Sequence, residues 1–445
     1  MFELDALLLA RVQFAFTISF HIIFPALSIG LAAYLALVNG LWLRTRNPVY
    51  LEIFSFLVKP FALCFGLGVV SGVVMAYQFG THWRGLSEFA GSVMGPLLTY
   101  EVLSAFFLEA GFLGVMIFGR NRVGPKLHFF ATLMVALGTL MSTFWILASN
   151  SWMHTPQGHL IEEGRVIPMD WWQIIFNPSF PYRLSHMTLA AFLSSAFFIA
   201  ALAAWQLKRQ PQPAHPAAKK MFSMALWLIV VLTPLQVLVG DLHGLNTLKY
   251  QPAKIAAMEG HWDPEPNGSS LILFGWPDMQ AEKTHYQVAI PKLGSLILHH
   301  DLHTPVPALK EFAPEDRPNA AVVFWSFRLM VGLGLLMLVS AAWSLWLRRK
   351  NQLYGQTRFL NWMQLMGASG VVALLAGWFT TEVGRQPWVI HGVLRTKDAV
   401  SPHSFSYMSF SLTSFVVVYC LIFGSGFYYL FRLARTPLPE EASHD

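Results

Sequence analysis

Residues Ile22–Leu43 read IIFPALSIGLAAYLALVNGLWL, and residues Val322–Leu347 read VVFWSFRLMVGLGLLMLVSAAWSLWL. The first run contains no charged residue, and the second contains only Arg328. A helix that crosses the hydrocarbon core of a bilayer needs about 20 mainly apolar residues. Each run therefore predicts a transmembrane helix.

The composition of the whole chain agrees with these two runs. Of 445 residues, 55% are hydrophobic and 12% are charged, about half the charged fraction of a soluble domain. The net charge of +6 does not point to nucleic acid as a partner, because the basic residues lie in short loops between apolar runs. The two cysteines, Cys64 and Cys420, lie within apolar runs and offer neither a disulfide framework nor a Cys-x-x-Cys motif.

The apolar runs predict an all-α integral membrane protein with about nine transmembrane helices. We expect them at residues 8–40, 52–80, 95–118, 127–151, 184–207, 220–243, 321–347, 359–381 and 406–432. Basic residues concentrate in the odd-numbered connections, for example Arg44 and Arg46 in the first, and Arg348, Arg349 and Lys350 in the seventh. Since positive loops stay in the cytoplasm, the N-terminus is expected outside and the C-terminus inside.

One connection is far longer than the rest. Residues 244–320 form an outer loop of a length that is usually functional or disordered. The expected organisation is therefore helices one to six over 1–243, the extracytoplasmic loop over 244–320, and helices seven to nine with a short cytoplasmic tail over 321–445.

Ionisable residues inside a membrane are costly and are usually functional. His186, Met330, Glu382 and Arg385 are expected in the outer half of the bilayer, with His21 deeper. Imidazole and thioether are common axial donors to heme iron, and buried arginines such as Arg328 and Arg385 suit heme propionates. Taken singly, each residue also fits a structural role: a packing histidine, a lipid-facing methionine, or a carboxylate at a helix end.

Glu101 and Glu109 lie two turns apart in the third predicted span. Two carboxyl groups so arranged could relay protons, or they could make two hydrogen bonds between helices. Both interpretations stay open at this point.

Several strings resemble one known family, subunit I of cytochrome bd-type quinol oxidases. They are Arg11–His21 (RVQFAFTISFH), Gln78–Trp83 (QFGTHW), Glu101–Glu109 (EVLSAFFLE), Trp145–Met153 (WILASNSWM), Phe327–Met330 (FRLM) and Gly377–Trp388 (GWFTTEVGRQPW). They occur in order from the first span to the eighth, so the resemblance covers nearly the whole chain.

The resemblance implies three hemes. His186 and Met330 match the axial ligands of a low-spin heme b, and His21 and Glu382 match the ligands of two high-spin hemes, one b-type and one d-type. Which of them holds which heme is left open. By the same resemblance, Glu101 matches a carboxylate beside the high-spin pair, and Glu109 matches its neighbour on the proton route. Trp378 and Arg385 match residues packed against the hemes. Arg328 matches an arginine near the low-spin heme.

The outer loop resembles the family's quinol-binding loop. Its string Gln251–Glu259 (QPAKIAAME) resembles a segment whose lysine and glutamate are implicated in quinol oxidation, which gives Lys254 and Glu259. On a regular helix these two would point about 140° apart, so both reach one quinol only if the segment is bent or one acts indirectly. The loop is of the short form, which includes cyanide-insensitive oxidases; some of these carry heme b in place of heme d.

The resemblance implies a quinol oxidase of the bacterial cytoplasmic (inner) membrane. It would oxidise quinol at the outer face and reduce O2 to water with protons from the cytoplasm. It would work with a second polytopic subunit, often with single-span accessory subunits. The sequence leaves open whether the substrate is ubiquinol or menaquinol. Two alternatives are a proton-coupled polytopic transporter and a quinone-linked cytochrome b without oxygen chemistry.

Overall fold

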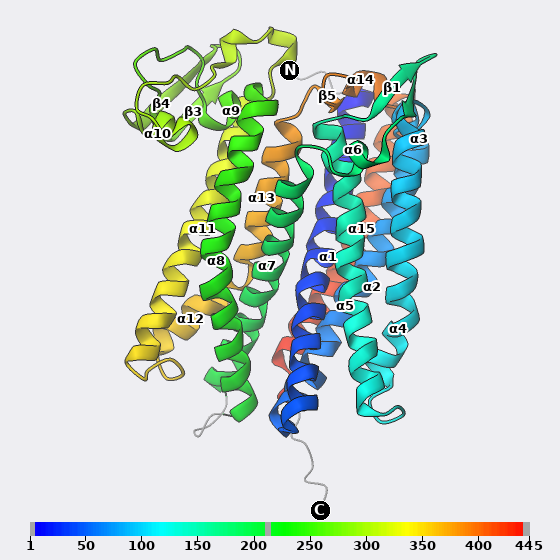
Figure 1. Ribbon diagram of the computed structural model, residues 1–445, viewed down its shortest axis with the longest axis vertical. Coiled ribbons are helices and arrows are strands. Elements are labelled where there is room, and N and C mark those ends of the chain that lie inside the picture. Colours follow the sequence, from blue (N-terminus) through cyan, green and yellow to red (C-terminus); the bar gives the residue numbers. More distant parts are fainter. Residues whose placement is uncertain (1–4, 210–214, 439–445) are drawn as a thin grey trace, which may run out of the picture.

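The computed structural model describes residues 5–209 and 215–438 and consists mainly of long, roughly parallel helices (Figure 1). Within these residues, nine helical segments are long and apolar enough to cross a membrane, which confirms the predicted fold class. They are α1 (Ala6–Thr45), α2 (Pro48–Thr81), α3 with η1 and α4 (Arg84–Tyr100, Glu101–Phe106 and Phe107–Phe118), α5 (Pro125–His154), α7 (Phe180–Arg209), α8 (Pro216–Tyr250), α11 (Ala320–Arg349), α12 with η4 and α13 (Thr357–Leu365, Met366–Ala368 and Ser369–Val383) and α15 (Phe405–Arg435).

Short elements gather at one end of the bundle, at the top of Figure 1, which we call the loop end. Three antiparallel hairpins lie there: β1 (His159–Glu162) with β2 (Arg165–Pro168), β3 (Leu271–Asp278) with β4 (Lys283–Ile290), and β5 (Trp388–Ile390) with β6 (Leu394–Arg395). The short helices α6 (Trp171–Ile175), α9 (Pro252–Glu259), α10 (Leu293–His299) and α14 (Thr396–Ala399) lie there too, with the 3-10 turns η2 (Leu309–Glu311) and η3 (Pro314–Asp316).

Local signals fix where the long helices begin. Asp5 caps α1 by accepting a hydrogen bond from the backbone of Leu8 at 2.6 Å, and Asn47 and Asn319 cap α2 and α11 in the same way. Proline occupies the first turn of α2, α5 and α8, where its missing N–H costs nothing.

The predicted ends of two spans need correction. The third span begins at Arg84 rather than at residue 95, because its first turns are polar and carry an exposed Arg84–Glu88 ion pair, so the apolar run starts later than the helix. The sixth helix continues to Tyr250, which shortens the long loop to residues 251–319. Residues 1–4, 210–214 and 439–445, including the end of the expected tail, lie outside the described residues.

Close packing of small residues joins the central helices. A side chain at Gly30 of α1 would lie 2.3 Å from the hydroxyl of Ser195 on α7, so glycine is needed for this approach. Beside this contact, α7, α8, α11 and α13 pack as a group of four helices. Each candidate ligand described below lies on one of these helices or on α1.

Candidate functional site

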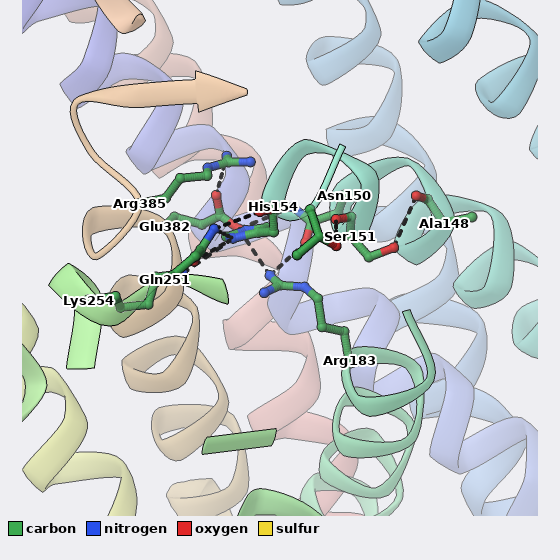
Figure 2. Close-up of polar contacts among 10 residues, drawn as sticks. Ala148, Asn150, Ser151, His154, Arg183, Gln251, Lys254, Glu382 and Arg385 are labelled. Carbon is green, nitrogen blue, oxygen red and sulfur yellow. Dashed lines mark hydrogen bonds and ion pairs between the residues drawn. The ribbon is translucent and has the colours of Figure 1, made fainter. Parts of the chain in front are cut away.

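A buried polar group lies where the loop end meets the bundle (Figure 2). Glu382, at the end of α13, is paired through one carboxylate oxygen with Arg385. Its other oxygen lies 3.1 Å from Nε2 of His154 on α5 and 3.5 Å from Nη2 of Arg183 on α7. Asn150 bridges Arg183 and Glu382, since its side-chain oxygen accepts from Arg183 at 2.8 Å and its side-chain nitrogen donates to Glu382 at 3.1 Å. Three helices far apart in sequence thus converge on one carboxylate.

This group has more positive charge than its own residues neutralise. Arg183 and Arg385 are both buried, and Nε of each, together with Nη1 of Arg385, has no hydrogen-bond partner among the described residues. Buried guanidinium donors without partners are costly, so an acidic group is needed beside them. Heme propionates have this chemistry, and the residues present fit them.

His186 and Met330 lie within the four-helix group. His186 of α7 faces α8, where Gln236 Nε2 lies 3.2 Å from its ring and a side chain at Gly240 would come within 3.2 Å of Cε1. Met330 of α11 faces α13, where a side chain at Gly377 would lie 2.7 Å from the sulfur. Each of these two candidate ligands thus packs closely against a glycine of the neighbouring helix, where a larger side chain would displace it.

His21 faces α2 in a similar way. Its Nδ1 lies 3.0 Å from the hydroxyl of Ser71, and a side chain at Gly72 would come within 3.1 Å of Cε1. Trp378 of α13 packs in the cluster that contains Ile18 and Ile22 on either side of His21. Trp378 therefore connects the helix of Glu382 with that of His21.

Glu101 and Glu109 both face α5. Ser142 donates to Glu101 at 2.7 Å, and a side chain at Gly138, one turn away, would lie 2.5 Å from Cγ of Glu109. The wide π-helical turn η1 lies between the two glutamates and changes the rotation from one to the next. Such turns often occur at functional sites, and this one aligns two carboxyl groups along one neighbouring helix.

Lys254 and Glu259 lie on different sides of α9, which is a regular helix. Lys254 donates to Nδ1 of His154 at 3.3 Å, and its stem packs against Gly384. Burial, with Arg183 and Arg385 nearby, holds the pKa of its ammonium well below the usual range. Lys254 therefore adjoins the Glu382 group.

Glu259 lies on the side of Arg328. Burial raises the pKa of its carboxyl, an effect that Arg328 and His261 oppose. Its Oε2 is buried without a hydrogen-bond partner among the described residues. Arg328 donates to the backbone carbonyl of Met258 in α9 at 2.6 Å, and to that of Ile272 on β3 at 3.0 Å. The two candidate quinol residues thus lie in different surroundings, Lys254 at the Glu382 group and Glu259 beside Arg328.

A cavity of about 280 Å³ opens on the Lys254 side of α9. Lys254, Arg385, His391, Asp316 and Trp388 are among the residues that line it. The pKa of His391 falls to about 4 because of burial and the nearby Lys254 and Arg385. Lys254 therefore borders this cavity, whereas Glu259 lies on the other side of α9.

Sequence reasoning missed several members of the buried group. Arg183, His154 and Gln251 were not singled out as site residues. The available signal was position: Arg183 lies at the start of a helix, His154 directly follows the string Trp145–Met153, and Gln251 and Asn150 lie within quoted strings.

The fold and these buried groups define a multi-pass membrane protein with several sites suited to hemes. Residues 9–438 match the family described as cytochrome bd terminal oxidase subunit I, and the chain belongs to this family. Membership implies bound hemes and a partner subunit.

Relatives match over nearly their whole length. Cytochrome bd ubiquinol oxidase subunit 1 of Bacillus subtilis is 35% identical, over 99% of this chain and 96% of that protein. Cytochrome bd-II ubiquinol oxidase subunit 1 of Escherichia coli is 30% identical, over 97% and 96%. The bd oxidase of Geobacillus thermodenitrificans superposes with a TM-score of 0.89 at 28% identity, covering 98% and 99%.

Proposed function

We propose that this chain is the heme-bearing subunit of a terminal quinol:oxygen oxidoreductase. Quinol is oxidised at the loop end, which faces outward, and O2 is reduced to water with protons from the cytoplasm. The observation that carries the proposal is the Arg183–Glu382–Arg385 group, a ligand-type carboxylate between two buried arginines, some of whose N–H donors have no partner among the described residues. A transporter or a structural role gives no reason for these donors.

Three hemes are assigned to the candidate ligands. His186 of α7 and Met330 of α11 would hold a low-spin heme b. His21 and Glu382 hold two high-spin hemes, one b-type and the other d-type or b-type. When bound, the hemes supply one-electron transfer and an iron position for O2. Arg183 and Arg385 bind propionates, Arg328 fixes the segment next to the low-spin site, and Trp378 packs between the high-spin ligands.

Glu259 is the residue best suited to accept a proton from quinol. Its buried Oε2, which has no hydrogen-bond partner in the part of the chain that the structure describes, is an acceptor. The raised pKa of this carboxyl brings it closer to the working pH, as a general base requires. Arg328 favours the carboxylate form. Lys254 lies on the other side of α9, so it can influence the same quinol only through other groups. Its role in quinol oxidation stays a prediction.

Glu109 and then Glu101 carry protons from the cytoplasm towards the high-spin hemes. Their shared orientation towards α5, next to Ser142 and Gly138, supports a relay rather than two unrelated helix contacts. Proton uptake on one side and release on the other then separate charge across the membrane.

The complex comprises a second polytopic subunit, with possible single-span accessory subunits, in the bacterial cytoplasmic membrane. The apolar outer surfaces of α8, α11 and α15 are available for lipid and for such partners. Whether the quinol is ubiquinol or menaquinol is a question for substrate assays.

Oxygen consumption by the purified complex tests the proposal, with ubiquinol and menaquinol analogues as donors. The native complex is expected to consume O2 with at least one donor. Glu109→Gln should slow turnover, and Glu88→Gln, which changes an exposed carboxylate, should not. Heme-bearing complex that oxidises no quinol with O2 would favour the cytochrome b alternative, and heme-free protein would favour a transporter.

A further inference from the structure

The β3–β4 hairpin of the long loop has two faces of different character. Its inner face holds the Glu259 segment: Thr284 donates to the backbone of Gly260 at 2.7 Å, and the carbonyl of Ile272 accepts from Arg328 at 3.0 Å. The outer face is apolar and exposed. Phe274 and Val288 are cross-strand partners and are 50% and 59% exposed, and Trp276 is 59% exposed.

An exposed apolar hairpin of this kind is a liability in water, because it invites aggregation. Some surface must therefore cover it. The candidates are the bilayer, a partner subunit and a second copy of this chain.

The outer face is continuous with an exposed apolar side of α11. The rings of Phe274 and Trp276 lie 5.2 Å and 6.5 Å from the ring of Trp325 on α11. Trp325, Leu329, Leu336 and Val339 follow one another on one face of that helix, and the last three are exposed. One apolar surface thus runs from the middle of the spanning helix onto the hairpin.

The level of the hairpin also favours the bilayer. Trp325 lies in the second turn of α11, which begins at Ala320, so Phe274 and Trp276 lie beside the spanning helix rather than above it. Figure 1 shows β3, β4 and α10 outside the bundle, next to the upper end of α11. Tryptophan and tyrosine concentrate where bilayer and water meet. The turn of the hairpin, in contrast, is polar, with Asp278, Gln280 and Lys283.

We propose that the outer face of the β3–β4 hairpin binds the boundary between lipid headgroups and acyl chains of the outer leaflet, and guides the tail of a membrane-dissolved quinol to Glu259. The guiding role rests on the proposed function, whereas the lipid contact does not. The outer face of the hairpin then contacts the bilayer in which the quinol is dissolved, and the inner face holds the segment of Glu259, the proton acceptor.

Depth-dependent quenching tests the lipid contact in the whole complex. In a Cys420→Ser background, which removes the exposed cysteine, a fluorescent label is placed through Val288→Cys, or through Gln280→Cys as a control on the same hairpin. The complex is reconstituted in vesicles with nitroxide-labelled lipids. We expect lipid quenching at 288 to be several-fold stronger than at 280, and aqueous quenching to show the reverse order.

Two results would overturn the lipid contact. The label at 288 could be quenched by the aqueous reagent as strongly as the label at 280, which would place the face in water. It could also be shielded from both quenchers, which would mean that a protein surface covers it.

Steady-state kinetics test the guiding role. Phe274→Ser combined with Trp276→Ser should raise KM for a long-tailed quinol about five- to ten-fold, while KM for a short-tailed, water-soluble analogue stays unchanged. Leu302→Ser, which alters an exposed apolar residue outside the hairpin, is the matched control. Equal changes for both quinols would refute the guiding role. If the native complex oxidised neither quinol, the proposed function would fail, while the quenching result would still decide the lipid contact.

Discussion

The hydroxyl of Ser71 lies 3.0 Å from Nδ1 of His21, and its own proton is already directed to the backbone of α2, where the carbonyls of Leu67 and Gly68 lie at 3.0 Å and 2.9 Å. With its proton on one of these carbonyls, Ser71 accepts from the histidine. In that arrangement Nδ1 carries the ring proton, and Nε2 is the bare nitrogen that could bind iron. Partners of this kind fix the orientation and basicity of histidine ligands.

Ser71→Ala should weaken heme binding at His21. Loss of such a partner typically costs about 10- to 100-fold in metal affinity or activity. We expect faster heme loss and an upward shift of the reduction potential of one high-spin heme, with the low-spin heme unchanged. Ser28→Ala removes another buried serine that bonds only to its own helix and serves as the control. If both variants behaved alike in redox titration, Ser71 would have no positioning role.

Gly377→Ala should displace Met330. The added methyl would lie 2.7 Å from the sulfur, and overpacking of this kind costs about 1–3 kcal/mol. The expected result is loss of low-spin character at one heme, measured by low-temperature EPR. Gly334→Ala, at a position with open space around it, should leave the spectrum intact. An unchanged low-spin signal in Gly377→Ala would argue against Met330 as a ligand.

Quinol oxidation should depend on the protonation of Glu259. Burial raises the pKa of this carboxyl, so its basic form is lost as the pH falls through that raised value, and kcat/KM for quinol should fall with it. Glu259→Gln should lower kcat/KM by about 100-fold, the lower range for general base catalysis, and remove this acidic limb. A pH–rate profile that kept the limb in the variant would assign it to another group.

Lys254→Met tests the Lys254 side of α9 independently of the Glu259 side. Methionine keeps an apolar stem against Gly384 but removes the amine that contacts His154. We expect altered heme absorption and little change in kcat/KM for quinol, opposite to the pattern of Glu259→Gln. A fall in kcat/KM equal to that of the glutamate variant would place quinol in the cavity beside Lys254.

The sequence was sufficient for the spans because about 20 consecutive apolar residues have few other structural solutions. It also singled out His21, His186 and Glu382, since ionisable groups in apolar runs are conspicuous, whereas Met330 depended on the resemblance of the string Phe327–Met330 to the family. Helix ends with polar turns were harder, as Arg84 shows, because hydropathy does not distinguish such a turn from a loop.

The contacts between distant segments could not be read from the sequence. The π-helical turn at Glu101–Phe106 depends on packing against α5, and its amino-acid composition does not distinguish it from an ordinary helical turn. The convergence of His154, Arg183 and Glu382 likewise depends on three helices meeting at one level. The separation of Lys254 from Glu259 was expected from helix geometry, and the regular helix α9 bears it out.

We propose that His186 and Met330 hold a low-spin heme b in an oxidase with three hemes. A reduced-minus-oxidised absorption spectrum of the purified complex, with pyridine hemochrome analysis and a His186→Ala variant, tests this assignment. Three hemes are expected in the native complex, with selective loss of the low-spin b-type signal in the variant. A far-red chlorin band would identify heme d, and its absence would identify b-type heme in its place. A native complex without heme, or a variant with an intact low-spin signal, would overturn the assignment.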